Sequence, residues 1–314
     1  MSTSHDRIAR RAYEIFQARG EQHGEDWADW FQAERHIRLT EPTLDELIAR
    51  IPSALFKYSG LDGERLEWMR RLIVDSQLFF TPPRYFNDPL DFRITPSFDA
   101  PREVVEQHWG DVAIRVGGQM SEDEREARVK TLIEQSSTRD GQAEFTRKLF
   151  DMMANHNGTV CLATDPVHML MWSYYADSHR GIAVRFGTDL DQIIALGRAL
   201  NAQGTDLYLI DVDYANEFPH CNYYTSSKYE RNKTLLGTKS SVWSHEGEWR
   251  IVLPGRTGYL NVPPQLITGI VLGLRTHADV EAKIRGWLAN RDPAVELLRV
   301  VHKPNSFRLE LAPA

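Results

Sequence analysis

Two short helical patterns open the chain. The first has apolar residues at helical spacing and ends at Gly20, with Ile8, Ala12, Ile15 and Phe16 on its apolar face. The second, DWADWFQAERHIRL, places another apolar set on one face: Trp27, Trp30, Phe31 and Ile37. Residues 5–38 are therefore predicted to form a helical hairpin, too small to bury its own apolar face, which docks on the main domain, a second copy or a partner.

The pattern between residues 41 and 157 is mixed. A short strand is predicted at 55–60, with Phe56 and Tyr58 on one face and Lys57 on the other. An amphipathic helix is predicted at 63–77 and a strand at 78–80, which two prolines stop. Residues 100–157 are helical and charged, and we interpret them as an insertion or lid against a sheet, or as a solvated helical layer.

From residue 158 the pattern becomes rich in β-type runs. Strands are predicted at 158–165, 182–186, 205–216, 248–254, 266–274, 295–303 and 306–312. Helices are predicted between them, at 166–181, 189–200 and 277–291, and 228–243 is expected to be partly helical. Because strands and helices do not alternate strictly, the fold class predicted is α+β with a mixed sheet. The domains expected are a hairpin module at 1–40 and an α+β domain at 41–314.

Composition narrows the class of protein. The chain has 314 residues, 42% of them hydrophobic, and eight tryptophans, which excludes general disorder. A net charge of −7 argues against generic binding to a phosphate backbone, so nucleic acid could be met only at a local basic site. Cys161 and Cys221 fit a reducing cytoplasm, and neither a signal peptide nor a membrane span is expected. A cytoplasmic location is therefore predicted.

The most unusual stretch is WSHEGEWRIVLP, residues 243–254. It carries two carboxylates, Glu246 and Glu248, two positions apart. In an extended strand these side chains stand side by side, Trp249 faces the other way, and Arg250 returns to the carboxylate face. Like charges this close raise one pKa and a guanidinium lowers it again. The arrangement indicates either a functional acid pair or an ordinary Glu–Arg pair at a strand end.

Four further stretches carry candidate chemistry: Lys57-Tyr58, the turn at 86–91, the segment at 172–181, and Lys239. Polar residues among aromatic ones suggest a cleft that holds a flat group and a charged group together. The structural alternatives are a turn role for Asn87 and Asp88, a surface role for His179 and Arg180, and a core role for Tyr174 and Tyr175. Motifs of Rossmann folds, P-loops, zinc proteases and nucleophile elbows do not occur.

Two resemblances follow from these motifs. The pieces AYEIF at 12–16 and DWFQAE at 29–34 resemble a short bacterial helical module of unknown function, DUF2934. The ordered set LFKY, FFTPPRYFNDPLD, VCLATD, LMWSYYADSHRGIAVRF, VDY and W-x-x-EGEWR resembles the bacterial domain-of-unknown-function 2971 family (DUF2971) over roughly residues 52–310. That family is grouped more distantly with ADP-ribosyltransferase-like folds.

The distant relation implies a split, mixed β core with an NAD cleft between its halves. By this resemblance Glu248 is the catalytic glutamate and Glu246 the partner that orients or deprotonates the acceptor. Lys57 or Tyr58 takes the first-strand position, where many relatives have Arg or His, and Thr164 helps to hold the glutamate. The remaining cofactor-binding residues expected in the cleft are Tyr174, Tyr175, His179, Arg180, Asn87 and Asp88.

Three hypotheses follow. The first is an NAD-using ADP-ribosyltransferase or NAD glycohydrolase, such as a toxin or defence effector, with NAD as substrate, no resident metal and an unknown acceptor. The second is a metal-dependent nuclease built on Asp88, Asp91, Glu246, Glu248 and Lys239. The third is a non-catalytic module that binds a nucleotide or, through the hairpin, a protein partner.

Overall fold

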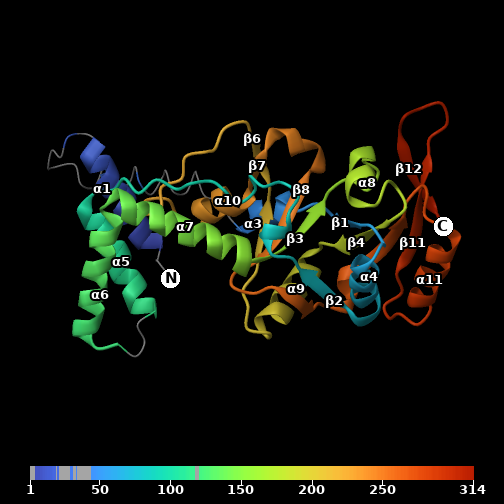
Figure 1. Cartoon of the computed structure of the whole chain (residues 1–314), viewed down its shortest axis with the longest axis horizontal. Helices are drawn as coiled ribbons and strands as arrows, with labels where there is room; N and C mark the ends of the chain where they lie inside the picture. The colour runs from blue at the N-terminus through green and yellow to red at the C-terminus, as the bar shows by residue number, and fades with distance from the viewer. Residues whose placement is uncertain (1–3, 19, 21–28, 31–32, 34–43, 117–119) are drawn as a thin grey trace. The chain divides into compact units, whose positions relative to one another are not determined.

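The computed structural model describes residues 4–18, 20, 29–30, 33, 44–116 and 120–314. Internal contacts divide the chain into two units (Figure 1). The first, here the helical unit, comprises Met1–Leu47, Arg93–Asp151 and Phe218–Leu235. The second, here the sheet unit, comprises Ile48–Phe92, Met152–Glu217 and Leu236–Ala314.

The helical unit is built around an aromatic cluster. Its helices include α1 (Ser4–Ala18), α5 (Arg102–Val116), α6 (Glu122–Ser136) and most of α7 (Arg139–His156) and α10 (Lys228–Gly237). The buried side chains of Trp109 and Tyr224 form the centre, and Phe98, Phe145 and Tyr223 pack around them. Ser121 caps the start of α6 with a capping box. Its hydroxyl accepts a hydrogen bond from the backbone amide of Glu124, and the Glu124 carboxylate accepts one from the backbone amide of Ser121. The predicted helical insertion at about 100–157 corresponds to α5, α6 and α7.

The sheet unit contains a mixed sheet of eight strands. Their order is β12-β11-β10-β4-β1-β3-β8-β5, and the β10–β11 pair is parallel whereas the other neighbours are antiparallel. The strands are β1 (Ala54–Ser59), β3 (Gly158–Ala163), β4 (Ile182–Gly187), β5 (Tyr208–Asp211), β8 (Glu248–Leu253), β10 (Ile267–Leu272), β11 (Glu296–His302) and β12 (Leu309–Pro313). The predicted α+β class with a mixed sheet is confirmed.

Helices cover both faces of this sheet. On one face α4 (Glu64–Asp75), α9 (Leu190–Asn201) and α11 (Ala278–Leu288) pack on a core that includes Leu55 and Val184. On the opposite face α8 (Met169–Tyr175) packs its fully buried Trp172 against Phe56 and Tyr58. Figure 1 shows α4 and α8 on opposite sides of the sheet. The alternation along β1 therefore sends successive side chains into two different layers. Each fully buried aliphatic or aromatic side chain contributes roughly 1.5–3 kcal/mol.

The sheet opens between β1 and β3. These strands share a single register pair, Phe56 with Ala163. At the other end of β3, Thr159 pairs instead with Thr81, which follows β2 (Gln77–Phe80). β2 itself pairs with β9 (Gly258–Asn261) in a separate ribbon. The second half of β1 thus diverges from β3 within the mixed sheet.

Two predicted elements differ from the structure. The run at 205–216 is two strands, β5 and β6 (Asp213–Ala215), and Val212 between them donates its amide to the carbonyl of Glu248. The run at 228–243 changes from α10 to β7 (Thr238–Ser240), which pairs in parallel with β6, and then to a 3-10 helix, η2 (Ser241–Glu246). Most of the second helix of the predicted hairpin, and the predicted boundary at 40/41, lie outside the described residues.

The remaining helices are short: α3 (Leu44–Arg50), η1 (Pro83–Tyr85) and η3 (Pro264–Leu266). Across the described parts of the chain, every helix falls short of the length and apolar character that crossing a bilayer requires.

Gly181, which precedes β4, offers a test of the packing at the end of the sheet. A Cβ there would stand 2.1 Å from the carbonyl oxygen of Ser59, so Gly181→Ala forces the backbone apart. We expect a loss of about 1–3 kcal/mol in the free energy of unfolding. The control is Gly286→Ala in α11, where a Cβ meets nothing within 4 Å and should stabilise the helix by up to about 1 kcal/mol. Urea denaturation measures both, and equal stabilities for the two variants would contradict the prediction.

Candidate functional site: a buried charge cluster beside a cavity

The two glutamates of the EGEWR stretch reach the site from different elements. Glu246 ends the 3-10 helix η2, Gly247 turns the chain in the left-handed region with φ +49°, and β8 begins at Glu248. A side chain at 247 would stand 2.5 Å from the hydroxyl of Thr164, so the turn requires glycine. The prediction that one strand aligns both acids is therefore wrong. Strand periodicity holds only from Glu248 onward, where Arg250 returns to the same face and Trp249 packs in the opposite core.

Lys239 joins the two acids instead. Its ammonium Nζ lies 2.5 Å from Oε2 of Glu246 and 3.2 Å from Oε2 of Glu248. All three residues are buried. Lys239 comes from β7, so pairing of that short strand with β6 brings the cation to the start of β8. The buried acids do not face bulk solvent.

Arg250 forms the other half of the cluster. It is fully buried on β8, and its Nη1 and Nη2 donate to the two carboxylate oxygens of Asp91 at 2.9 and 2.7 Å. Its Nε donates to Oε1 of Glu248 at 2.8 Å, and Nη1 also reaches the carbonyl of Leu236. The guanidinium lies over the ring of Phe92. Such a bidentate, charge-assisted arrangement fixes the geometry of all its partners.

Opposing electrostatic effects act within this cluster. Burial alone would raise the pKa of Glu248, but attraction from Arg250 and Lys239 outweighs burial and lowers that pKa to about 2. Burial alone would lower the pKa of Lys239, but Glu248 and Glu246 raise it above its ordinary value. For Asp91 burial dominates, so its pKa is raised although Arg250 opposes the change. Glu248 and Lys239 are thus held as a charged pair.

A cavity of about 310 Å³ lies in the sheet unit beside this cluster. β1 contributes Lys57, Tyr58 and Ser59 to its lining, at the place where β1 diverges from β3. The structure brings together there five of the nine residues predicted to bind a cofactor: Lys57, Tyr58, Asn87, Tyr174 and Tyr175. The rest of the lining comes from α4, β2 and Thr81. Its volume is at the lower end of the roughly 300–1,000 Å³ range of ligand sites.

Tyr175 connects the cavity to the charge cluster. It lines the cavity, and its hydroxyl donates to Oε1 of Glu246 at 2.5 Å. The same hydroxyl accepts from the side-chain amide of Asn87 at 3.1 Å. Burial and the neighbouring Glu246 carboxylate raise the pKa of Tyr175, so it remains a protonated donor at neutral pH. Glu246 therefore acts on the cavity through one hydrogen bond.

The other four predicted cofactor-binding residues lie elsewhere than in the described cavity lining. Thr164 packs against the turn at Gly247, and Asp88 accepts from the amide of Leu90 in its own turn. Arg180 is bound by Asp177 through two hydrogen bonds of 2.9 Å. His179 stacks on Trp172 at 6.3 Å and contacts the hydroxyl of Ser173. Asp88 thus has the turn role, and Arg180 the surface ion pair, that were considered as alternatives.

Some residues of the site were not predicted. Trp68 of α4 and Phe79 of β2 line the cavity and stack at 5.0 Å with an interplanar angle of 14°. Tyr214 of β6 accepts the amide hydrogen of Glu248 on its hydroxyl at 2.8 Å. The sequence signals for Trp68 and Phe79 were ordinary helix and strand periodicity, which marks an apolar face without saying that a cavity adjoins it.

Three of the four acids considered for a metal-dependent nuclease are bound to protein cations. Asp91, Glu246 and Glu248 form ion pairs with Arg250 and Lys239, whereas Asp88 accepts from the amide of Leu90. Among the residues the structure describes, no group of three or more His, Cys, Asp or Glu side chains is arranged to hold a metal ion. The geometry thus favours an ion-pair cluster at this position.

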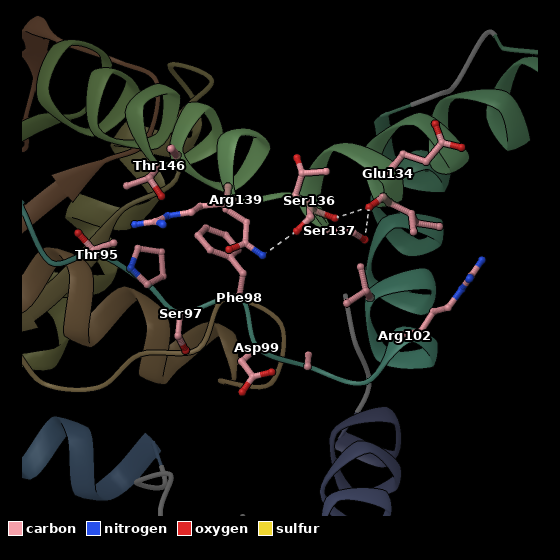
Figure 2. Close-up of a pocket in the computed structure, with 17 residues that line it drawn as sticks. Thr95, Ser97, Phe98, Asp99, Arg102, Glu134, Ser136, Ser137, Arg139 and Thr146 are labelled. Atoms are coloured by element: carbon pink, nitrogen blue, oxygen red, sulfur yellow. Dashed lines mark hydrogen bonds between the residues drawn. The ribbon is translucent and has the colours of Figure 1, made fainter.

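A second, larger cavity of about 1,330 Å³ lies within the helical unit (Figure 2). Segment 95–100 forms one side, and the residues around the α6–α7 junction form the other. The lining carries hydroxyl groups, Phe98 and the exposed Arg139, and Gln142 donates to the carbonyl of Ser136 at 2.9 Å. None of the predicted site residues lines this cavity.

Comparison with known proteins gives two family matches. Residues 3–38 match the family described as "Protein of unknown function (DUF2934)", and residues 171–251 match "Protein of unknown function (DUF2971)". Both predicted resemblances are thus confirmed over these residues. The second match runs from α8 to β8 and includes Tyr175, Lys239, Glu246 and Glu248. No curated protein and no solved structure matches the chain, and the more distant ADP-ribosyltransferase likeness stays a prediction.

Lys239→Met tests the charge cluster. The variant leaves Glu246 and Glu248 buried with one cation fewer, so we expect the free energy of unfolding to fall by about 3–5 kcal/mol. Lys283→Met, at an exposed position of α11, is the control and should change stability by less than about 0.5 kcal/mol. Chemical denaturation at pH 7 measures both. A Lys239→Met protein as stable as the control would show that the cluster contributes little.

The lowered pKa of Glu248 predicts how the cluster responds to acid. Its pKa changes from an ordinary 4.5 to about 2 in the fold, so its stabilisation is complete above about pH 4.5 and is lost as pH falls toward 2. The raised pKa of Asp91 has the opposite effect on stability, because its contribution to the free energy of unfolding falls as the pH rises. We therefore compare wild type with Glu248→Gln: the stability difference should be large at pH 6 and shrink at pH 3. Thermal unfolding across this range measures it, and a difference independent of pH would contradict the assignment.

Proposed function

We propose that this chain is an NAD-using enzyme, an NAD glycohydrolase or ADP-ribosyltransferase, whose substrate site is the cavity beside β1. One observation carries the proposal: the cavity gathers five predicted residues and is joined to the buried acid pair through the Tyr175–Glu246 hydrogen bond. The similarity of residues 171–251 to DUF2971 is compatible with this function but names no activity.

The lining supports binding of a flat group next to an anionic one. Trp68, Phe79 and Tyr58 offer aromatic surfaces to the flat group. Arg65 offers a positive charge in the same cavity, and Lys57 offers an amine. A volume of about 310 Å³ suits one nucleoside end of NAD better than the whole dinucleotide. The rest of the molecule would extend outside the cavity.

The acid pair would stabilise positive charge on the sugar. When the bond between nicotinamide and the ribose breaks, its electron pair leaves with nicotinamide and the sugar becomes cationic. Glu246, acting through the Tyr175 hydroxyl, gives this part of the cavity a negative potential. Water or an acceptor nucleophile then bonds to the sugar carbon. Both oxygens of Glu248 are bound by Arg250 and Lys239, so we assign Glu248 a positioning role and Glu246 the nearer electrostatic one.

Because both oxygens of Glu248 already bind protein cations, a second candidate function is favoured: a module that binds a nucleotide without turning it over. A carboxylate whose oxygens are both bound by protein cations is a stable structural element. The two candidates share the cavity and its ligand class. They differ only in whether nicotinamide is released.

The test is incubation of the full chain with NAD, with release of nicotinamide followed by chromatography. We expect release by wild type and a loss of roughly 10²–10³-fold in Tyr175→Phe, which removes the hydroxyl between Glu246 and the cavity. Tyr85→Phe, a change of the same type at an exposed residue outside the cavity, is the control and should retain full activity.

Three results are informative. Binding of NAD without nicotinamide release, measured by calorimetry, would select the non-catalytic module. Equal rates in Tyr175→Phe and Tyr85→Phe would remove the Tyr175–Glu246 pair from the mechanism. A protein that neither binds nor consumes NAD would overturn the proposal.

A further inference from the structure

Lys57 occupies an unusual position for a lysine. It lies in the middle of β1, on the opposite face from Phe56 and Tyr58, and its side chain is half-buried in the cavity lining. Aromatic side chains of Trp68 and Phe79 line the same cavity. An ammonium in such surroundings loses hydration that only a carboxylate or another acceptor can replace.

Within the described residues, the structure gives Lys57 no carboxylate partner. The titratable groups near it are the Cys161 thiol of β3, which interacts with it electrostatically, and three groups of the cavity lining: Arg65 of α4 and the hydroxyls of Tyr58 and Tyr175. Both hydroxyls donate elsewhere, Tyr58 to the carbonyl of Asp165 and Tyr175 to Glu246. Burial lowers the pKa of Lys57, and only Cys161 opposes this change.

Lys239 provides the contrast inside the same unit. It is buried, and two carboxylates lie within 3.2 Å of its ammonium and raise its pKa. Lys239 is therefore held as a cation, whereas burial lowers the pKa of Lys57 and makes its neutral amine more accessible than that of an ordinary lysine. A neutral amine with a free lone pair is a nucleophile.

We propose that Lys57 is a nucleophilic amine that reversibly binds an aldehyde in the cavity as an imine. Its nitrogen lone pair forms a bond to the carbonyl carbon, and the carbonyl oxygen takes up a proton to give a carbinolamine. Loss of the nitrogen proton and of that oxygen as water then forms the C=N double bond, and addition of water reverses the reaction. The aromatic lining suits an aldehyde on a flat, apolar group.

The magnitude of the expected effect follows from protonation. A lysine of ordinary pKa, about 10.4, is a free amine in only roughly one molecule in 2,500 at pH 7. A lysine that burial deprotonates more readily reacts faster in proportion to its larger free-amine fraction. The Lys57 amine reacts in this way whether or not the cavity binds NAD.

The experiment treats the intact protein at pH 7 with benzaldehyde and sodium cyanoborohydride, which reduces an imine to a stable secondary amine. Peptide mapping by mass spectrometry then gives the labelling rate of each lysine. We expect Lys57 to be labelled at least about tenfold faster than the exposed Lys283. Lys239 should remain unlabelled, because its two carboxylates keep it protonated.

The controls decide the outcome. Lys57→Arg replaces the amine with a guanidinium that cannot form an imine, so the rapid labelling should disappear and only the slower labelling of the exposed lysines should remain, with the fold checked by circular dichroism. Labelling of wild-type Lys57 no faster than Lys283 would overturn the inference, and so would equal labelling of Lys57 and Lys239. Because the readout is covalent labelling in wild type, a failure of NAD turnover leaves this result unaffected.

Discussion

The buried guanidinium of Arg250 is the constraint around which the site is arranged. A charge removed from water on an interior strand must be matched by opposite charge and hydrogen bonds, or the fold is disfavoured by several kcal/mol. This requirement is met by Glu248 on the same strand, by Asp91 at the end of the FNDPLD turn, and by the carbonyl of Leu236 in α10. Three segments far apart in the chain are thereby held in one geometry, and Lys239 extends the network to Glu246.

This network gives the two glutamates different hydrogen-bond partners. Glu248 is held by cations on both oxygens, whereas Glu246 directs one oxygen to Lys239 and the other to Tyr175 at the cavity. The two lysines also differ in their surroundings, since Lys239 has two carboxylates and Lys57 lines the cavity among aromatic groups. The cavity lining thus carries a lysine amine and a phenol that donates to a buried carboxylate. Such a lining suits a ligand with a flat group and separate polar groups.

The cavity exists because two strands part. β1 and β3 pair once, at Phe56 and Ala163, and Thr81 then takes the place of β1 beside β3. Lys57 and Asn87 line this opening together with aromatic and apolar residues of both cores. Because the strands diverge here, Trp68 of α4 and Phe79 of β2 line a cavity of ligand size.

Local patterns determined much of the architecture. Period-two alternation correctly placed Lys57 opposite Phe56 and Tyr58, and Arg250 with Glu248, and helical spacing predicted α4, α9 and α11. Only the tertiary structure decided the partners: Asp91 with Arg250, 159 residues apart, and Tyr175 with Glu246, 71 residues apart. It also moved Glu246 off the strand, through a left-handed turn at Gly247. Periodicity encodes which face a side chain takes within its own element. The choice among distant partners depends on how whole elements pack, which neighbouring residues do not specify.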